Sequence, residues 1–382
     1  MSSFDTLQKS RTLRKILAYV GLWTEADEER AWRGIALSLL IHVPLTFSYT
    51  ILMWMDVYFS TDLPQATDVL YMALTETALV VKILSLLYYR NMARRMFNEW
   101  QNGEQFRLHS VMEKRMWRRS FSTFGIVFRW YITCSFSVVG CSFAAVLFLN
   151  TYKLPFPYWT PFDWNQPIYY WYAYMYEALA MPLTCISNST LDMWQCYIML
   201  HLATCYRLIA MRLQNLNDKP NEGENSVKQD IIEIVQFEQE VKRTSKQCER
   251  IVSYPVLAQI LLSALVLCFS LYRLQNANFW EDPGNFIALF QYAVCMTLQI
   301  FLPCYYANKL TVESSSLMDS AYNSNWMDMQ LSDRRLLLQY MQYLNKPVIL
   351  RASRFFYIGL PVFTKTMNNA YSFFALLLNM DL

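Results

Sequence analysis

The chain has 382 residues, of which 54% are hydrophobic and 16% charged, and its formal net charge is +3. Several apolar stretches exceed 18 residues, which excludes an ordinary soluble domain and favours a polytopic membrane protein. The first apolar run follows a polar segment, residues 1–33, and is too long for the core of a signal peptide, so no cleavable signal is expected.

Apolar runs predict seven membrane-spanning helices. A helix needs about 20 residues to cross the hydrocarbon core of a bilayer, and each run reaches that length. In chain order we expect the spans at residues 34–59, 67–88, 122–149, 168–213, 252–272, 284–306 and 357–380. The predicted fold class is therefore an all-α membrane protein with seven transmembrane helices.

The fourth run is 46 residues long, so it could be one helix or two spans with a turn near Asn188. Basic residues decide between the two, because they mark the cytoplasmic side of a membrane. If the run is one crossing, one side of the membrane holds 28 of the 33 Lys and Arg residues, in segments 1–33, 89–121, 196–251 and 307–356, and the other side holds two. We therefore predict a single long fourth helix, a cytoplasmic N-terminus and an extracellular C-terminus.

Two cytoplasmic segments carry apolar residues at helical spacing, with Ile231, Ile234 and Phe237 in one and Leu337 and Tyr340 in the other. Amphipathic helices of this kind bury one face, so we expect them to pack together as an intracellular anchor domain. The predicted regions are a cytoplasmic N-terminal segment (1–33), helices one to four (34–213), a cytoplasmic helical segment (214–251), helices five and six (252–306), the anchor segment (307–356) and the last helix with the C-terminus (357–382).

Motifs for catalysis are missing from the sequence, which has no HExxH, GxSxG, phosphate-binding glycine loop or CxxC. His201 and Cys205 stand at i and i+4, where a metal could use both, but no further ligand accompanies them. None of the nine cysteines falls in a predicted outer segment, so no extracellular disulfide is expected. We expect neither an enzyme nor a metal or cofactor.

Five ionisable residues lie inside predicted spans, where charge is costly: Glu76, Lys82, Arg129, Glu177 and Asp192. The two basic residues stand near cytoplasmic helix ends, so we expect both to extend to water. The three acids are expected to face the bundle interior or a wet cavity, with a structural hydrogen bond as the default role.

The outer halves of several spans combine aromatic and small residues. An apolar pocket with a few hydroxyl groups suits a small neutral molecule, although helix packing and an interfacial aromatic belt explain the same composition. The candidates for such a pocket are Tyr71, Thr75, Ser137, Gly140, Ala144, Tyr176, Met181, Phe290 and Tyr292.

The last span has two different faces. Small and polar residues recur on one side at steps of three or four, and Phe363, Phe374 and Leu377 lie opposite. A polar stripe in a membrane helix meets protein or water rather than lipid. The stripe therefore either packs against another helix or lines a pore; its members are Thr364, Asn368, Ser372, Ala375 and Asn379.

The C-terminal third resembles the signature of insect odorant receptors. The matching residues are Leu298-Gln299-Ile300-Phe301-Leu302-Pro303-Cys304-Tyr305, then Asn308, Leu310, Glu313-Ser314, Ala321-Tyr322 and Trp326, then Arg351-Ala352-Ser353-Arg354-Phe355-Phe356, and finally Ala370-Tyr371-Ser372-Phe373-Phe374-Ala375-Leu376-Leu377. The length, the topology and the long fourth helix of the whole chain agree with that family.

This resemblance implies an odorant-binding subunit of a heteromeric, odour-gated, non-selective cation channel in the plasma membrane of olfactory neuron dendrites. It implies a tetramer with the odorant receptor co-receptor, a small volatile ligand and no nucleic acid. The ligand pocket would lie between the second, third, fourth and sixth helices, among the nine candidates above. The last helix would line the pore with Ser372, Ala375, Leu378 and Asn379. Leu378 would form the hydrophobic gate, where the co-receptor has valine.

Three other classes remain to be weighed. A gustatory-type channel subunit shares the topology, although the pattern from Cys304 to Trp326 points away from it. A seven-helix metabotropic receptor has its N-terminus outside, against the distribution of basic residues. A secondary transporter usually shows inverted repeats, and the sequence has none that we detect.

Overall fold

The computed structural model describes residues 6–24, 31–147, 153–162, 167–216, 226–277, 280, 283–353 and 355–380. Almost all of these residues are helical, as predicted. The helices are α1 (Gln8–Tyr19), α2 (Ala31–His42), α3 (Ser48–Phe59), α4 (Leu63–Asn102), α5 (Val111–Leu147), α6 (Pro167–Gln214), α7 (Ser226–Asn276), α8 (Pro283–Ser315), α9 (Leu317–Tyr322), α10 (Leu331–Leu344) and α11 (Leu360–Met380).

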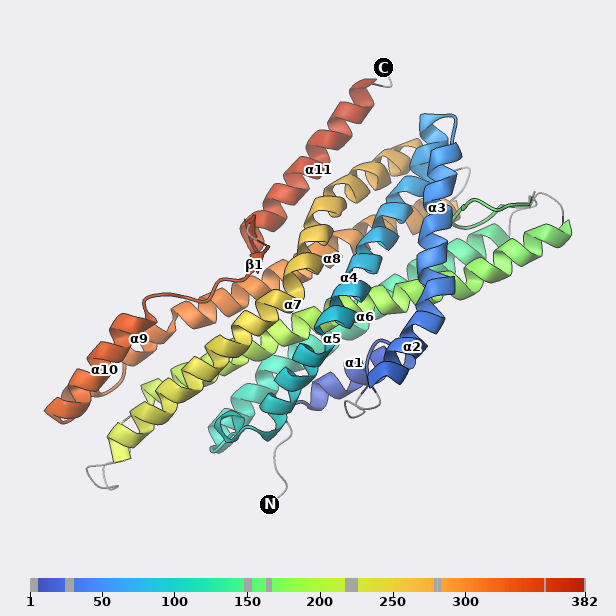
Figure 1. Cartoon of the computed structure of the whole chain (residues 1–382). Helices are drawn as coiled ribbons and strands as arrows, with labels where there is room; N and C mark the ends of the chain where they lie inside the picture. The colour runs from blue at the N-terminus through green and yellow to red at the C-terminus, as the bar shows by residue number, and fades with distance from the viewer. Residues whose placement is uncertain are drawn as a thin grey trace.

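The long helices α4 to α8 lie side by side in one elongated bundle (Figure 1). The two chain ends lie at opposite ends of the bundle, with α9 and α10 at the end away from the C-terminus. Helix α11 continues from the bundle toward the C-terminal end, where it packs against α7 and α8.

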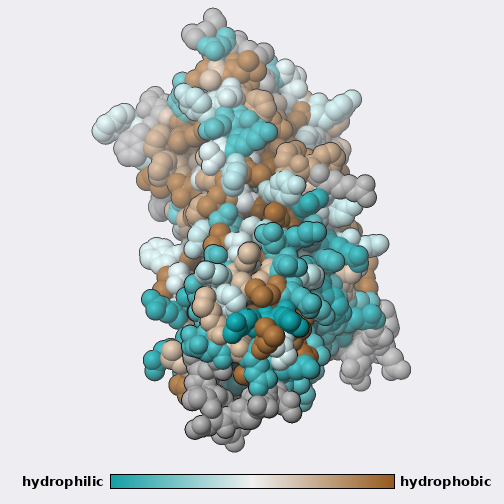
Figure 2. Space-filling model, turned by 90° about the vertical axis from the view of Figure 1, so that its left-hand side faces the viewer, coloured by the Kyte–Doolittle hydropathy of each residue, from teal (hydrophilic) through white to brown (hydrophobic). Residues whose placement is uncertain are grey.

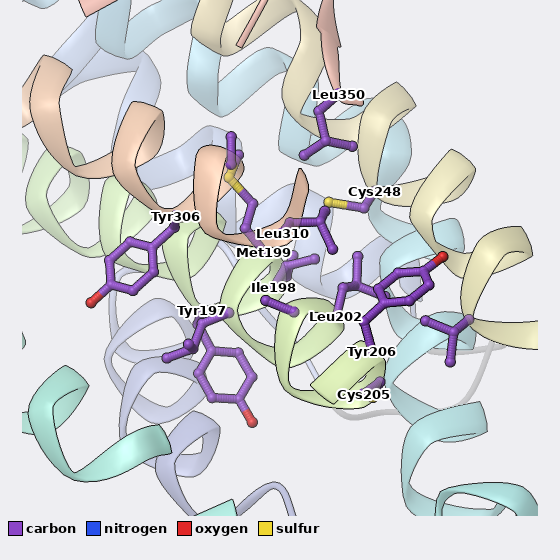
Figure 3. Close-up of a cluster of buried hydrophobic side chains, with 14 of the residues drawn as sticks. Tyr197, Ile198, Met199, Leu202, Cys205, Tyr206, Cys248, Tyr306, Leu310 and Leu350 are labelled. Carbon is purple, nitrogen blue, oxygen red and sulfur yellow. The ribbon is translucent and has the colours of Figure 1, made fainter. Parts of the chain in front are cut away.

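Helix α6 is one uninterrupted helix from Pro167 to Gln214, which confirms the prediction of a single long fourth helix. Its second half is buried on every side: from Ser189 to Ala210 only Arg207 is exposed. Figure 3 shows side chains of this half meeting Cys248 and Leu310 from α7 and α8. This half of α6 is therefore surrounded by protein.

Three boundaries differ from the sequence prediction. The cytoplasmic helix expected to end near residue 251 and the fifth span form one helix, α7, of 51 residues. The first span contains a π-helical turn, Val43–Phe47, between α2 and α3. Two short antiparallel strands, β1 (Arg351–Ala352) and β2 (Phe356–Tyr357), precede α11, so the last helix begins at Leu360 rather than Tyr357.

Within the described part of the chain, five helical stretches are long and apolar enough to cross a membrane: residues 34–59, 65–102, 111–146, 227–276 and 283–322. They contain the first, second, fifth and sixth predicted spans, and the third as far as residue 146. The fourth and seventh, in α6 and α11, are more polar. In the face shown by Figure 2, hydrophobic residues dominate toward the C-terminal end and hydrophilic residues dominate the other half, as expected for a protein partly in lipid and partly in water.

The expected packing of the amphipathic helices is confirmed. Ile231, Phe237 and Val241 of α7 and Leu337 and Leu344 of α10 are buried in one hydrophobic cluster with the second half of α6. Helices α9 and α10 lie at the end of the bundle away from the C-terminus (Figure 1).

A buried ion pair joins α4 to α6. Lys82 Nζ lies 2.5 Å from Asp192 Oδ1, and the two side chains are only 1% and 2% exposed. The expectation that Lys82 extends to water is therefore wrong: an acid stands within its reach in the bundle interior. Arg129 is exposed, and the three acids Glu76, Glu177 and Asp192 are buried as predicted.

Replacing Lys82 with Met should destabilise the protein strongly, because it leaves the Asp192 carboxylate buried without its cation. Breaking a buried pair from one side costs about 3–5 kcal/mol. The measurement is the melting temperature of the purified protein in detergent. The double variant Lys82→Met/Asp192→Leu should recover part of the loss. The control Arg107→Ala, which breaks an exposed pair with Glu104, should leave the melting temperature unchanged.

If the single and double variants melt at the same temperature, the pair has no part in holding α4 to α6.

Candidate functional site

A cavity of about 60 Å³ lies between α4, α5, α6 and α8. These are the second, third, fourth and sixth predicted spans. Its walls are mostly apolar and sulfur-containing, with six hydroxyl groups and one carboxyl group. The lining residues that carry the argument below are Met72, Thr75, Glu76, Val138, Met181 and Met296.

A second, larger cavity of about 290 Å³ lies beyond it, toward the outer ends of the helices. The loop from Lys153 to Pro157 lines this outer cavity together with α4, α5, α7 and α8. The loop is tied to α6, because the Phe156 amide donates to Glu177 Oε1 at 2.6 Å. The Tyr158 hydroxyl donates to the Ala173 carbonyl at 2.9 Å. The outer cavity therefore has a fixed wall on the loop side.

Tyr292 lines both cavities and separates them. Its ring packs edge-on against Tyr71, with centroids 5.0 Å apart. Its hydroxyl is 2.6 Å from Thr75 Oγ1, and Thr75 donates to the Tyr71 carbonyl at 2.9 Å. Arg273 lies over the other side of Tyr71 and pairs with Asp68 at 2.8 Å. This chain of contacts holds the partition between the cavities in one arrangement.

The floor of the inner cavity is a polar network built on the Lys82–Asp192 pair. Asp192 Oδ2 accepts from the Tyr131 hydroxyl at 3.2 Å and from the Gln299 amide at 2.8 Å. Asn188 Oδ1 accepts from Lys82 at 2.8 Å and from Gln299 at 3.1 Å. The network draws side chains from α4, α5, α6 and α8, so it fixes all four walls of the cavity relative to one another.

Four of the nine predicted pocket residues line these cavities. Tyr71 lines the outer one, Thr75 and Met181 line the inner one, and Tyr292 lines both. The other five line neither. Gly140, Ala144 and Phe290 are exposed on the single chain, Ser137 accepts a hydrogen bond from Gln291, and the Tyr176 hydroxyl donates to the Pro44 carbonyl at 2.7 Å.

The cavity side of α5 is offset from the predicted one. Tyr131, Ser135, Val138, Ser142 and Ala145 line the two cavities, and their spacing of three or four residues places them on one helix face. The predicted face of Ser137, Gly140 and Ala144 lies about 150° away around the helix. Sequence periodicity could have identified either face, since both carry small and polar residues.

Other lining residues were not singled out for the pocket from the sequence. Met72, Cys185, Cys295 and Met296 carry no motif, and only their helical spacing from Thr75, Met181 and Tyr292 could have pointed to them. Asn188 drew attention as a possible turn, but it lies within α6 and lines the cavity. Gln299 belongs to the C-terminal signature, which gave no hint of its bond to Asp192.

The polar stripe of α11 is open on the single chain. Thr364, Asn368, Ser372 and Asn379 are exposed, whereas Ala375 and Leu378 are half-buried. The opposite face packs on the bundle, where the Phe363 ring contacts Phe301 of α8 with centroids 5.4 Å apart. The stripe is therefore not a packing seam against the described helices of its own chain.

Metal and disulfide chemistry have little support. All nine cysteines are free, although Cys134 Sγ and Cys295 Sγ are 3.1 Å apart beside the inner cavity. His201 stacks on Trp100 with centroids 3.9 Å apart, and its Nδ1 is 3.7 Å from Cys205 Sγ. Among the described residues, no group of three or more His, Cys, Asp or Glu side chains could hold a metal ion.

Comparisons with known proteins point to one family. The family model described as 7tm Odorant receptor matches residues 62–371. Odorant receptor 94a of Drosophila melanogaster is 42% identical over 99% of this chain and 98% of its own length. Odorant receptor 46a, isoform A, of the same species is 25% identical over 95% of this chain and 96% of its own length.

Solved structures share the fold. The insect olfactory receptor OR5 from Machilis hrabei, in complex with eugenol, matches with a TM-score of 0.81 and 19% identity over 98% of both chains. A second structure of OR5 matches with a TM-score of 0.79 and 18% identity. The matched family model and the 42% identical relative lead to one conclusion: this chain belongs to the 7tm odorant receptor family of insects, which are membrane receptors rather than enzymes.

Proposed function

We propose that this chain is the odorant-binding subunit of a heteromeric, odour-gated, non-selective cation channel in the plasma membrane of olfactory neurons. Its partner would be the odorant receptor co-receptor, with the N-terminus in the cytoplasm and the C-terminus outside. The observation that carries the proposal is the exposed polar stripe on α11. A small volatile would bind between α4, α5, α6 and α8.

The stripe needs a polar neighbour. Amide and hydroxyl groups facing lipid have no partner for their hydrogen bonds, which is costly in the hydrocarbon core. The described helices of this chain leave Asn368, Ser372 and Asn379 uncovered. Equivalent helices of neighbouring subunits, arranged around a water-filled axis, would supply that environment. Amides and small hydroxyls on such an axis suit weakly selective cation flow.

Helix α8 offers a path from the cavity to α11. Gln299 of α8 joins the floor of the inner cavity, and the next residue, Ile300, is buried against Ala370 of α11 together with Cys304. A ligand that binds more tightly when α8 and α11 are displaced would shift the population toward an open pore. The direction of the shift depends only on that difference in affinity.

The pocket in this proposal consists of Tyr71, Thr75, Met181 and Tyr292, with Met72, Val138 and Met296 added from the structure. Aromatic, aliphatic and thioether side chains suit a small, mostly apolar volatile. Ser137, Gly140, Ala144, Tyr176 and Phe290 would influence binding only through their neighbours. The eugenol complex of OR5 supports an aromatic volatile as one ligand class.

Whole-cell current tests the proposal directly. Cells that express this chain with the co-receptor should pass a cation current within milliseconds of a volatile that binds, and the current should survive G-protein blockade. Cells with either subunit alone should lack that odour response. A response that needs G-protein signalling, or that appears without the co-receptor, would contradict the channel assignment.

Leu378→Ala should raise the current in the absence of odour. A ring of leucine side chains blocks ions by excluding water, and shortening them lets water enter the constriction. Leu377→Ala is the matched control, because it removes the same atoms from the opposite face of α11. That control should alter stability without opening a leak. Unchanged basal and odour-evoked currents in a delivered Leu378→Ala channel would remove Leu378 from the gate.

A further inference from the structure

The inner cavity contains one carboxyl group with an oxygen atom that no neighbour bonds. Glu76 is 3% exposed and lines the cavity from α4. Its Oε2 atom is buried and has no hydrogen-bond partner among the residues that the structure describes. A buried acceptor without a partner is costly, so this atom is a place where a ligand can gain affinity.

Most hydroxyl groups around Glu76 are already engaged. Five of the six that line the cavity make a hydrogen bond within the protein, namely those of Thr75, Tyr131, Ser135, Thr184 and Tyr292. A hydroxyl group has one hydrogen to donate. A ligand that can only accept would therefore have to displace an existing bond to be held by any of these five.

Glu76 Oε2 can accept a hydrogen bond when the carboxyl group is ionised, or when its proton is on the other oxygen. The Thr184 hydroxyl, which lines the same cavity from α6, does not compete for this atom, because it donates to the Met181 carbonyl at 3.0 Å.

We propose that Glu76 makes the inner cavity selective for volatiles that carry a hydroxyl donor, that is, alcohols and phenols, over matched ethers and ketones. The ligand hydroxyl donates to Glu76 Oε2. This inference rests on the proposed function in that it takes the inner cavity as the odorant site. It goes beyond that function by naming the ligand class and the residue that selects it.

The remaining walls suit the carbon body of such a ligand. Met72, Met181 and Met296 surround the cavity with Val138 and Val139. Methionine is unbranched and changes rotamer easily, so a cavity of about 60 Å³ can enlarge around a compact ring. A six-membered ring with one hydroxyl group places its polar atom at Glu76 and its apolar atoms against the methionines.

Binding to the purified protein tests this without relying on current. The full chain is purified with its co-receptor, and ligand affinity is taken from the concentration dependence of the melting temperature. The probes are two matched pairs: benzyl alcohol with benzyl methyl ether, and cyclohexanol with cyclohexanone. We expect each alcohol to bind about 10-fold or more tightly than its partner, the size of one buried hydrogen bond.

Three variants assign the preference to Glu76. Glu76→Met keeps the length of the side chain without the acceptor, and should bring each pair to equal affinity. Glu76→Gln keeps one acceptor oxygen and should retain part of the preference. Met296→Leu reshapes the same cavity without touching a polar group, and should change both members of a pair alike.

Each outcome separates the two proposals. Equal affinity within the pairs in the native protein, no binding of either alcohol, or a preference that survives Glu76→Met would overturn the role of Glu76, even if odour-gated current is present. The opposite combination is also possible. If the preference for alcohols disappears only in Glu76→Met, the hydroxyl site is supported. If the same protein passes no odour-gated current with its co-receptor, the channel assignment is overturned instead.

Discussion

The buried pair of Lys82 and Asp192 constrains the whole membrane half of the molecule. Two charges leave water on folding, and their attraction offsets that cost only if their remaining hydrogen bonds are also satisfied. Here Tyr131, Asn188 and Gln299 supply those bonds. Each partner comes from a helix that also lines the inner cavity. The arrangement of helices that satisfies the ion pair is therefore also the one that shapes the inner cavity.

Much of the fold could be predicted because lipid and water impose simple rules. Long apolar runs gave the spans, and the one-sided distribution of basic residues gave the single fourth helix, which the structure has as α6. The boundaries inside α7 could not be obtained in this way. Hydropathy changes near residue 251, where the environment changes, but backbone hydrogen bonds continue through both environments, and the described helix runs unbroken to Asn276.

The site was harder to predict because it depends on helix rotation. Phe290 and Tyr292 are two residues apart, about 200° around a helix, so they cannot both face one cavity. The structure places Tyr292 inside and Phe290 outside. The position of Lys82 depends on a partner 110 residues away in the chain, Asp192. The sequence places Lys82 near the predicted cytoplasmic end of the second span, which favoured contact of its side chain with water. No pattern of neighbouring residues indicated the acid that pairs with it.

The fourth and seventh predicted spans are too polar to be recognised as membrane helices by length and hydropathy alone. Recognition by hydropathy assumes that lipid surrounds the helix. Helix α6 has protein around its second half and carries Asn188 and Asp192 into the polar network. Helix α11 carries amides and hydroxyls on a face that its own chain leaves open. A helix that carries such polar groups cannot have a uniformly apolar surface, because each group must bond to a neighbour or to water. The residues that lower the hydropathy of these helices are thus those with partners other than lipid, and they are the residues on which binding and permeation would depend.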